Sequence, residues 1–227
     1  MERTKKNKLD ILVLGRATID INPADFSHSF AENASFCKYV GGSSANTAVG
    51  LAKLGLRVGF MGCVSRDSLG DYVISYLKEN GVDTSGMVRA ENGALLGLAF
   101  TEVKDGATNL MMYRNDQVAD LQLKCTDVEE ETIASADYLL VNGTSLSASP
   151  SREAALKAIL LARKNGVKVA FDLDYRPQVW KNKDEVSLYN LVPEEEKSAP
   201  SVAVEMHCGS QRGYFCVHRK AFDSTER

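Results

Sequence analysis

Residues 41–55 read Gly-Gly-Ser-Ser-Ala-Asn-Thr-Ala-Val-Gly-Leu-Ala-Lys-Leu-Gly and carry the strongest structural signal in the sequence. The first two glycines allow a tight turn and a close approach of the backbone to a ligand, because neither has a Cβ. Ser43 or Ser44 can cap a helix, and Gly55 is placed to end it. The stretch predicts a glycine loop that leads into a helix whose free amides face a ligand. The alternative is a tight strand-to-helix turn with no ligand.

Composition limits the class of protein. The chain has 227 residues, of which 44% are hydrophobic and 25% charged, enough for one α/β domain with its own core. The net charge of −3 gives no reason to expect nucleic acid as a partner. No apolar run is long enough to span a membrane, and the basic residues 1–8 precede only four apolar residues, too few for a signal peptide. We therefore expect no membrane partner and a cytoplasmic location.

The five cysteines do not predict a disulfide framework, because their number is odd and no two are spaced as Cys-x2-Cys. His207-Cys208 and Cys216-x-His218 suggest a zinc site at first sight. Their spacing matches no common set of zinc ligands, so we expect no metal there.

Strands and helices alternate along most of the chain, which is typical of βαβ units with a largely parallel sheet. Residues 95–103 and 108–113, joined by Lys104-Asp105-Gly106, instead predict a β-hairpin. The alternative for the hairpin is two further strands of the main sheet. The other expected strands cover residues 10–15, 138–143 and 167–171, and the expected helices cover residues 43–54, 68–80, 127–135 and 151–165.

Three motifs in the right order resemble the ribokinase (PfkB) family of carbohydrate kinases. They are Gly-x4-Asp at residues 15–20, Gly-Gly-x3-Asn at 41–46, and Leu-Gly-x6-Gly-x4-Asp-x2-Gly at 54–70. The resemblance extends over about residues 10–180, with Ser44 standing where the family more often has a small apolar residue or proline. It implies a three-layer α/β domain of ribokinase-like fold, with a mostly parallel sheet and a small β lid at about residues 95–113.

Asp20 lies just past the end of the first strand, where open α/β sheets bind ligands. A carboxylate there can accept hydrogen bonds from two sugar hydroxyls at once. The family resemblance assigns sugar binding to this aspartate, helped by the glycine loop and the asparagine, which in this sequence are Gly41, Gly42 and Asn46. The alternative for Asp20 is a turn or helix cap.

Two arginines point to an acidic sugar. Arg176 follows a buried strand, and Arg114, with Tyr113, ends the expected lid. A guanidinium is a planar fork suited to a carboxylate, so two of them fit a sugar acid better than a neutral sugar. Residues 172–180 resemble the branch of the family that phosphorylates keto-deoxy-gluconates, in particular 5-dehydro-2-deoxygluconate in inositol breakdown. Tyr113, Arg114, Asp174 and Arg176 are therefore expected to bind substrate.

A structural role for Arg176 remains open, because it could form an ion pair with Asp172 or Asp174.

The motifs for phosphoryl transfer are not in this sequence. The resemblance implies ATP and Mg²⁺, served late in the chain by Asn-x2-Glu and by Gly-Ala-Gly-Asp, whose aspartate is the base. The sequence contains no Gly-Ala-Gly-Asp, and residues 190–193 read Asn-Leu-Val-Pro. We therefore assign no catalytic residue, no metal ligand and no ATP-binding residue. We expect residues 1–192 to form the sugar-binding part of a C-terminally incomplete domain, and residues 193–227 an atypical, disordered tail.

The sequence thus predicts an ATP-dependent sugar or sugar-acid kinase by family, inactive as this chain. The alternative is a non-catalytic sugar-binding or regulatory protein on the same fold. A Rossmann nucleotide-binding enzyme is disfavoured, because residues 15–18 (Gly-Arg-Ala-Thr) do not start a Gly-x-Gly-x2-Gly motif. The expected partner is a small sugar or sugar acid, and the lid strands could join two copies into a homodimer.

Overall fold

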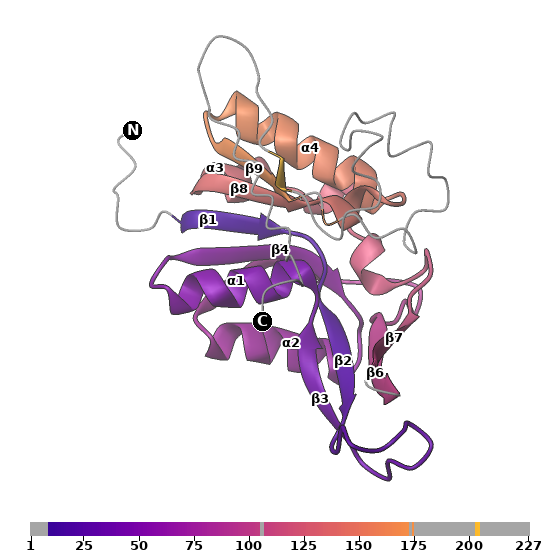
Figure 1. Ribbon diagram of the computed structural model, residues 1–227. Helices are drawn as coiled ribbons and strands as arrows, with labels where there is room; N and C mark the ends of the chain where they lie inside the picture. The colour runs from indigo at the N-terminus through magenta and orange to yellow at the C-terminus, as the bar shows by residue number, and fades with distance from the viewer. Residues whose placement is uncertain (1–8, 105–106, 173, 175–202, 205–227) are drawn as a thin grey trace.

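The computed structural model of the protein describes residues 9–104, 107–172, 174 and 203–204 (Figure 1). These residues form a six-stranded main sheet, in the order β10-β9-β8-β1-β4-β5, and a separate four-stranded sheet. Five strands of the main sheet run parallel, and the two-residue β10 pairs antiparallel with β9 at the edge. The mostly parallel sheet predicted from the alternating pattern is confirmed. The strands are β1 (Leu9–Leu14), β4 (Val58–Val64), β5 (Val82–Arg89), β8 (Ala136–Asn142), β9 (Lys168–Asp172) and β10 (Ala203–Val204).

Helices cover both faces of the main sheet. From β1 the chain moves towards β5 through the first two helices, and from β8 it moves the other way to β9 through α4. Because parallel crossovers are right-handed, the two directions place these helices on opposite faces, which gives the expected three layers. Every residue of β4 is buried, as in a strand covered on both faces. The helices are α1 (Ser43–Lys53), α2 (Ser68–Glu79), α3 (Glu130–Ala134) and α4 (Ser151–Lys164), with short 3₁₀ helices η2 (Ala119–Leu121), η3 (Cys125–Asp127) and η4 (Gly143–Leu146).

The glycine-led helix is confirmed as α1, but its N-cap differs from the expectation. Gly55, with φ 90°, donates its amide to the Ala52 carbonyl and ends the helix as predicted. At the other end the N-cap is Gly42, and no side chain caps the helix. Ser43 instead donates its hydroxyl to Asp174, and Ser44 is buried, so neither serine is the predicted cap.

The Gly-x4-Asp-x2-Gly part of the third motif has a structural explanation. Asp67 is the N-cap of α2 and accepts hydrogen bonds from the backbone amides of Leu69 and Gly70, both at 3.0 Å. A Cβ on Gly70 would lie 2.1 Å from the Ser65 carbonyl oxygen. Asp67 and Gly70 therefore fix the start of α2 against the preceding loop.

The predicted hairpin is confirmed as β6 (Leu98–Lys104) and β7 (Ala107–Tyr113), but the lid is wider than expected. Two more strands complete it, β2 (Thr18–Pro23) and β3 (Phe36–Gly41), in the order β3-β2-β6-β7. The lid projects from the end of the main sheet where β1 runs out into β2 (Figure 1).

No helix among the described residues is long and apolar enough to cross a membrane. The expected tail, residues 193–227, lies outside the described residues apart from Ala203 and Val204 of β10.

Candidate functional site

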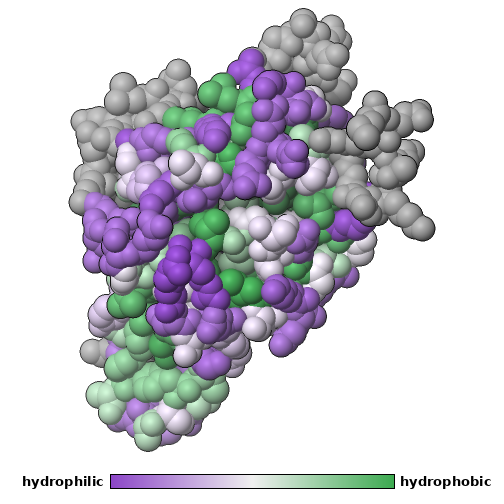
Figure 2. Space-filling view, turned by 180° about the vertical axis from the view of Figure 1, so that it is seen from behind, coloured by the Kyte–Doolittle hydropathy of each residue, from purple (hydrophilic) through white to green (hydrophobic). Residues whose placement is uncertain are grey.

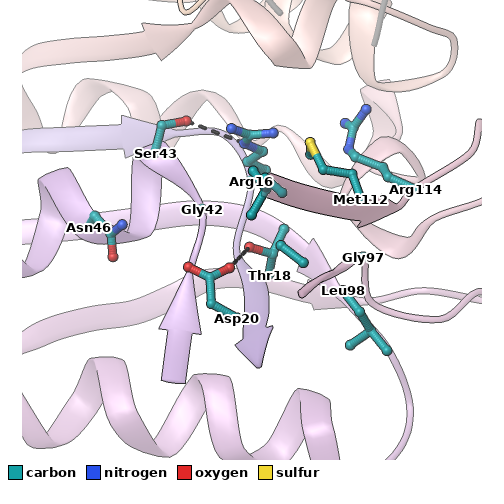
Figure 3. A pocket seen from close by; sticks show the side chains of 12 residues that line it. Arg16, Thr18, Asp20, Gly42, Ser43, Asn46, Gly97, Leu98, Met112 and Arg114 are labelled. Carbon is teal, nitrogen blue, oxygen red and sulfur yellow. Dashed lines mark hydrogen bonds between the residues drawn. The ribbon is translucent and has the colours of Figure 1, made fainter. Parts of the chain in front are cut away.

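A cavity of about 260 Å³ lies between the end of β1, the start of α1 and the lid (Figure 3). In the main sheet β1 lies between β8 and β4. The strands that follow β1 are added towards β5, and the later strands are added on the other side towards β9, so the direction in which the sheet is built reverses at β1. Open α/β sheets bind ligands outside the carboxyl ends of their strands at such a switch point. The cavity is lined by Arg16, Thr18, Asp20, Gly42, Ser43, Asn46, Gly97, Leu98, Ala99, Leu110, Met112 and Arg114.

Asp20 enters the cavity from β2, and Gly41 on the neighbouring strand makes room for it. A Cβ at Gly41 would lie 2.1 Å from Asp20 Oδ1, so no larger residue fits beside the carboxylate in this position. Burial raises the pKa of Asp20, while the hydroxyl of Thr18, 3.5 Å away, and the charge of Arg16 act in the opposite direction. Asp20 is thus a half-buried acceptor that a ligand's hydroxyl groups can reach.

Gly42 and Asn46 come from the loop and first turn of α1. Gly42 has φ 95°, a conformation that L side chains rarely adopt, and a Cβ there would lie 2.6 Å from the Arg16 carbonyl oxygen. Figure 3 shows the Asn46 amide and the Asp20 carboxylate in the same half of the cavity. Together they offer hydrogen-bond acceptors and donors within one small space.

Two arginines line the cavity, and only one of them was predicted. Arg16 Nη2 lies 3.3 Å from Asp174 Oδ2, and its Nε donates to Ser43 Oγ, also at 3.3 Å. Arg114 contacts a different carboxylate, Asp120. In Figure 3 the two guanidinium groups lie in the half of the cavity opposite Asp20, with Met112 between them. The cavity therefore has an arginine half, in which each guanidinium is paired with a buried carboxylate, and a hydroxyl-binding half.

Four predicted site residues are not among the lining residues, and Gly41, which stands beside Asp20, is the first of them. Asp174 is 2% exposed and lies behind Arg16 and Ser43, whose hydroxyl donates to it at 2.5 Å. Tyr113 is 63% exposed and packs edge-on against Phe100 at the lid. Arg176 lies outside the described residues.

Sequence reasoning missed Arg16 and the lining side chains of the lid strands, among them Leu110 and Met112. The available signal for Arg16 was its position, two residues after the first strand ends. For Leu110 and Met112 it was the two-residue period, which puts both side chains on one face of β7.

The chemistry of the lining suits a small polyhydroxylated anion. Hydroxyls can bind at Asp20 and Asn46, an acidic group at the arginines, and C–H faces against Leu98 and Met112. ATP and Mg²⁺ do not fit this cavity. The cavity lies below the roughly 300–1,000 Å³ of sites for drug-sized ligands, and no group of three or more His, Cys, Asp or Glu among the described residues could hold a metal ion.

Comparisons with known proteins agree with this fold. A family model described as "pfkB family carbohydrate kinase" matches residues 8–193. The 5-dehydro-2-deoxygluconokinase of Clostridium perfringens is 48% identical over 197 residues, which are 86% of this chain and 58% of that protein. The chain thus spans less than two thirds of the length of this curated relative.

Solved structures show the same architecture. A PfkB protein from a Polaromonas species superposes with a TM-score of 0.73 at 26% identity, over 81% of this chain and 62% of that one. Fructokinase from Xylella fastidiosa, crystallised with bound ATP, gives a TM-score of 0.69 at 28% identity, over 79% of this chain and 53% of that one. With the family model matching most of its residues, this chain belongs to the pfkB family of carbohydrate kinases.

Proposed function

We propose that this chain is the sugar-binding part of an ATP-dependent sugar-acid kinase and that its sugar acid is 5-dehydro-2-deoxygluconate. The observation that carries the proposal is the division of the cavity, with Arg16 and Arg114 in one half and Asp20 and Asn46 in the other. The name of the Clostridium perfringens relative, at 48% identity, supports the choice among sugar acids.

The division of the cavity sets the orientation of the substrate. Its carboxylate faces the guanidinium groups, because charge-assisted hydrogen bonds from arginine to a carboxylate are stronger than hydrogen bonds between neutral groups. Its hydroxyls then reach Asp20 and Asn46. Asp174 contributes indirectly, because it holds Arg16 and Ser43 in place from behind the cavity wall.

ATP is the proposed phosphoryl donor, as it is the ligand in the Xylella fastidiosa fructokinase crystals. When bound, ATP would supply the phosphoryl group and Mg²⁺ would offset the negative charge of its phosphates. We propose that residues 1–192 form the sugar-binding part and residues 193–227 a tail of different character. The end of the family match at residue 193 supports this division.

A homodimer through the lid is part of the proposal. Exposed apolar side chains gather on the lid, and Figure 2 shows its lobe as largely hydrophobic from behind. Tyr39 and Leu110, on β3 and β7, are 51% and 53% exposed. Light scattering at increasing protein concentration tests this, and a monomer throughout would contradict it. A cytoplasmic location follows from the proposed reaction, because ATP is its donor.

The second candidate is a non-catalytic sugar-binding or regulatory protein. It is favoured by one observation, the lack of a Gly-Ala-Gly-Asp motif in the sequence. It would bind the same ligand with the same residues, so binding and phosphoryl transfer have to be measured separately.

Isothermal titration of the 227-residue chain with 5-dehydro-2-deoxygluconate, gluconate, ribose and fructose tests the proposal. We expect the keto-deoxy acid to bind most tightly. Equal or tighter binding of neutral fructose would contradict the assignment of the arginines. If the chain bound none of these sugars, the proposed function would be wrong.

A further inference from the structure

Arg114, in the cavity wall, forms an ion pair with a carboxylate that does not line the cavity. Arg114 Nη2 lies 2.6 Å from Asp120 Oδ2, and the two side chains are 5% and 2% exposed. Asp120 belongs to the short 3₁₀ helix η2, which follows β7. Helix η2 packs against β4 of the main sheet, and the buried ion pair is little screened by water.

Two polar atoms of the Arg114–Asp120 pair make no hydrogen bond among the described residues. They are Arg114 Nε and Asp120 Oδ1, and both are buried. Asp120 occupies only Nη2 of the guanidinium fork, which leaves other N–H donors of Arg114 for a ligand. A buried donor without an acceptor is unfavourable, and a ligand with an acceptor group that reaches Arg114 would relieve this cost.

The charge of Asp120 has a second consequence. A ligand carboxylate that approaches Arg114 meets a cation whose charge is already compensated by Asp120. The carboxylate of Asp120 also repels the carboxylate of the ligand, since like charges in a poorly screened site oppose each other. Asp120 therefore stabilises the empty cavity and weakens the attraction that Arg114 exerts on an anion.

We propose that Asp120 is an internal counter-ion that competes with the substrate's carboxylate for Arg114 and so limits the preference of the cavity for acids over neutral sugars. The identity of the anion rests on the proposed function, whereas the competition for Arg114 does not.

The direct test is Asp120→Asn. The amide keeps a carbonyl oxygen that can accept from Arg114 Nη2, but it removes the negative charge. We expect the variant to bind 5-dehydro-2-deoxygluconate about tenfold more tightly than the wild type, from the Coulomb energy of one removed like charge at an intermediate dielectric. Fructose affinity should stay unchanged. The empty variant should melt at a lower temperature, and the sugar acid should raise its melting temperature more than that of the wild type.

Two controls separate this effect from general electrostatics and from structural damage. Glu131→Gln removes the same charge from an exposed position on α3. Glu131 lies near Leu9 at the start of β1, at the end of the strands opposite to the cavity, so this variant should leave acid affinity unchanged. In an Arg114→Met background, Asp120→Asn should no longer increase acid affinity, because the cation for which it competes is gone.

Acetate, titrated at constant ionic strength while the melting temperature is followed, serves as a minimal carboxylate. If the wild type binds no sugar acid but acetate stabilises Asp120→Asn more than the wild type, the proposed substrate is wrong and the counter-ion role stands. If the sugar acid binds the wild type and binds Asp120→Asn no more tightly, the counter-ion role is overturned and the proposed function stands.

Asp120→Asn could also fail to fold, since it leaves a buried arginine uncompensated. The double variant Arg114→Met, Asp120→Asn then tests whether the uncompensated charge of Arg114 causes the folding defect. Recovery of a folded protein would support the counter-ion role, because the defect would stem from the charge of Arg114. A double variant that also fails to fold would contradict it.

Discussion

On the lid, the carboxylate of Asp20 occupies the space that a Cβ on Gly41 would fill. The two residues lie on neighbouring antiparallel strands, with Gly41 opposite Thr18 and Asp20 opposite Tyr39. The three atoms nearest to a Cβ built on Gly41 are the carboxylate oxygens and Cγ of Asp20, at 2.1 to 2.3 Å. The first glycine of the Gly-Gly motif is thus required by the side chain of the carboxylate beside it, and not by its own backbone conformation.

Gly41→Ala should therefore reduce binding more than stability. The atoms in the way are the end of a side chain, which can rotate aside at about 0.5–1.5 kcal/mol, the cost of leaving a favoured rotamer. Rotation takes the carboxylate out of its position in the cavity, so sugar-acid affinity should fall about as far as in Asp20→Ala. Titration and urea unfolding measure the two effects.

Gly50→Ala is the matched control, since nothing lies within 4 Å of a Cβ at this exposed position in α1. It should stabilise the protein by about 0.5–1 kcal/mol and leave binding unchanged. Unaltered sugar-acid affinity in Gly41→Ala would show that Asp20 does not need its observed position.

Asp20→Ala should weaken binding of 5-dehydro-2-deoxygluconate by about 1–3 kcal/mol, because hydroxyls of the ligand lose a charged acceptor in a partly buried site. Asp25→Ala removes a carboxylate from the exposed loop between β2 and β3, outside the cavity, and should have no effect on affinity. Equal affinity of wild type and Asp20→Ala would exclude Asp20 from the site.

The raised pKa of Asp20 predicts a pH dependence of stability. Burial, the largest cause, favours the protonated form in the folded state, so the charged carboxylate destabilises the fold once it ionises. This destabilisation is absent well below the ordinary pKa of 3.8 and complete above the raised pKa of the folded state.

Asp20→Asn cannot ionise and should therefore gain stability relative to the wild type as the pH rises through this window. Urea unfolding of both proteins from pH 3 to pH 7, without ligand, measures the difference. A difference that stays constant with pH would show that the folded and unfolded states share one pKa for Asp20.

Ser44 occupies the space beside Gly15. It is 1% exposed, and its hydroxyl has no hydrogen-bond partner among the described residues. Ser44→Ala should be neutral or stabilising by about 1 kcal/mol, since it removes a buried unpaired hydroxyl. Gly15→Ala should destabilise by about 1–3 kcal/mol, because its Cβ would lie 1.9 Å from Ser44 Oγ.

In the double variant, Ser44→Ala should relieve only part of the Gly15→Ala defect, because the Cβ of Ser44 is itself 2.8 Å from the new methyl group. Full recovery in urea unfolding would mean that the hydroxyl alone causes the clash, and a strongly destabilised Ser44→Ala would reveal a partner for the hydroxyl.

The sequence predicted the mostly parallel character of the main sheet and its strands β1, β8 and β9, because local patterns define them, but it did not predict β4 and β5 as strands. Helix α1 ends at Gly55 as expected, and the alternation of apolar strands with amphipathic helices needs only short-range information. The lid was half missed, because β2 and β3 are joined through residues 24–35 and no short turn between them marks a hairpin.

The site was predicted where one motif supplies the residue and missed where the fold brings distant residues together. Asp20 and Asn46 stand in motifs, and both line the cavity. The position of Asp174 behind Arg16 depends on a contact between residues 158 apart in sequence, which no local pattern contains. The pairing of Arg114 with Asp120 depends on η2, a turn with no periodicity to predict it.

Phosphoryl transfer provides the sharpest test, because the family and the residues of this chain disagree about it. The family consists of kinases, yet the sequence has no Gly-Ala-Gly-Asp motif to supply the base and the anion-binding amides. Loss of a general base alone lowers a rate by about 10²–10⁴-fold, and loss of phosphate positioning compounds it. We expect the purified 227-residue chain to release no measurable ADP from Mg·ATP with 5-dehydro-2-deoxygluconate in a coupled assay.

A chimera that continues residues 1–192 with the remaining part of the Clostridium perfringens 5-dehydro-2-deoxygluconokinase should be active, because the sugar-binding half then meets a complete nucleotide half. Asp20→Ala in that chimera should lower its activity, which would tie the turnover to the cavity described above. Robust turnover by the 227-residue chain itself would instead show that an acid within residues 193–227, such as Glu205 or Asp223, serves as the base.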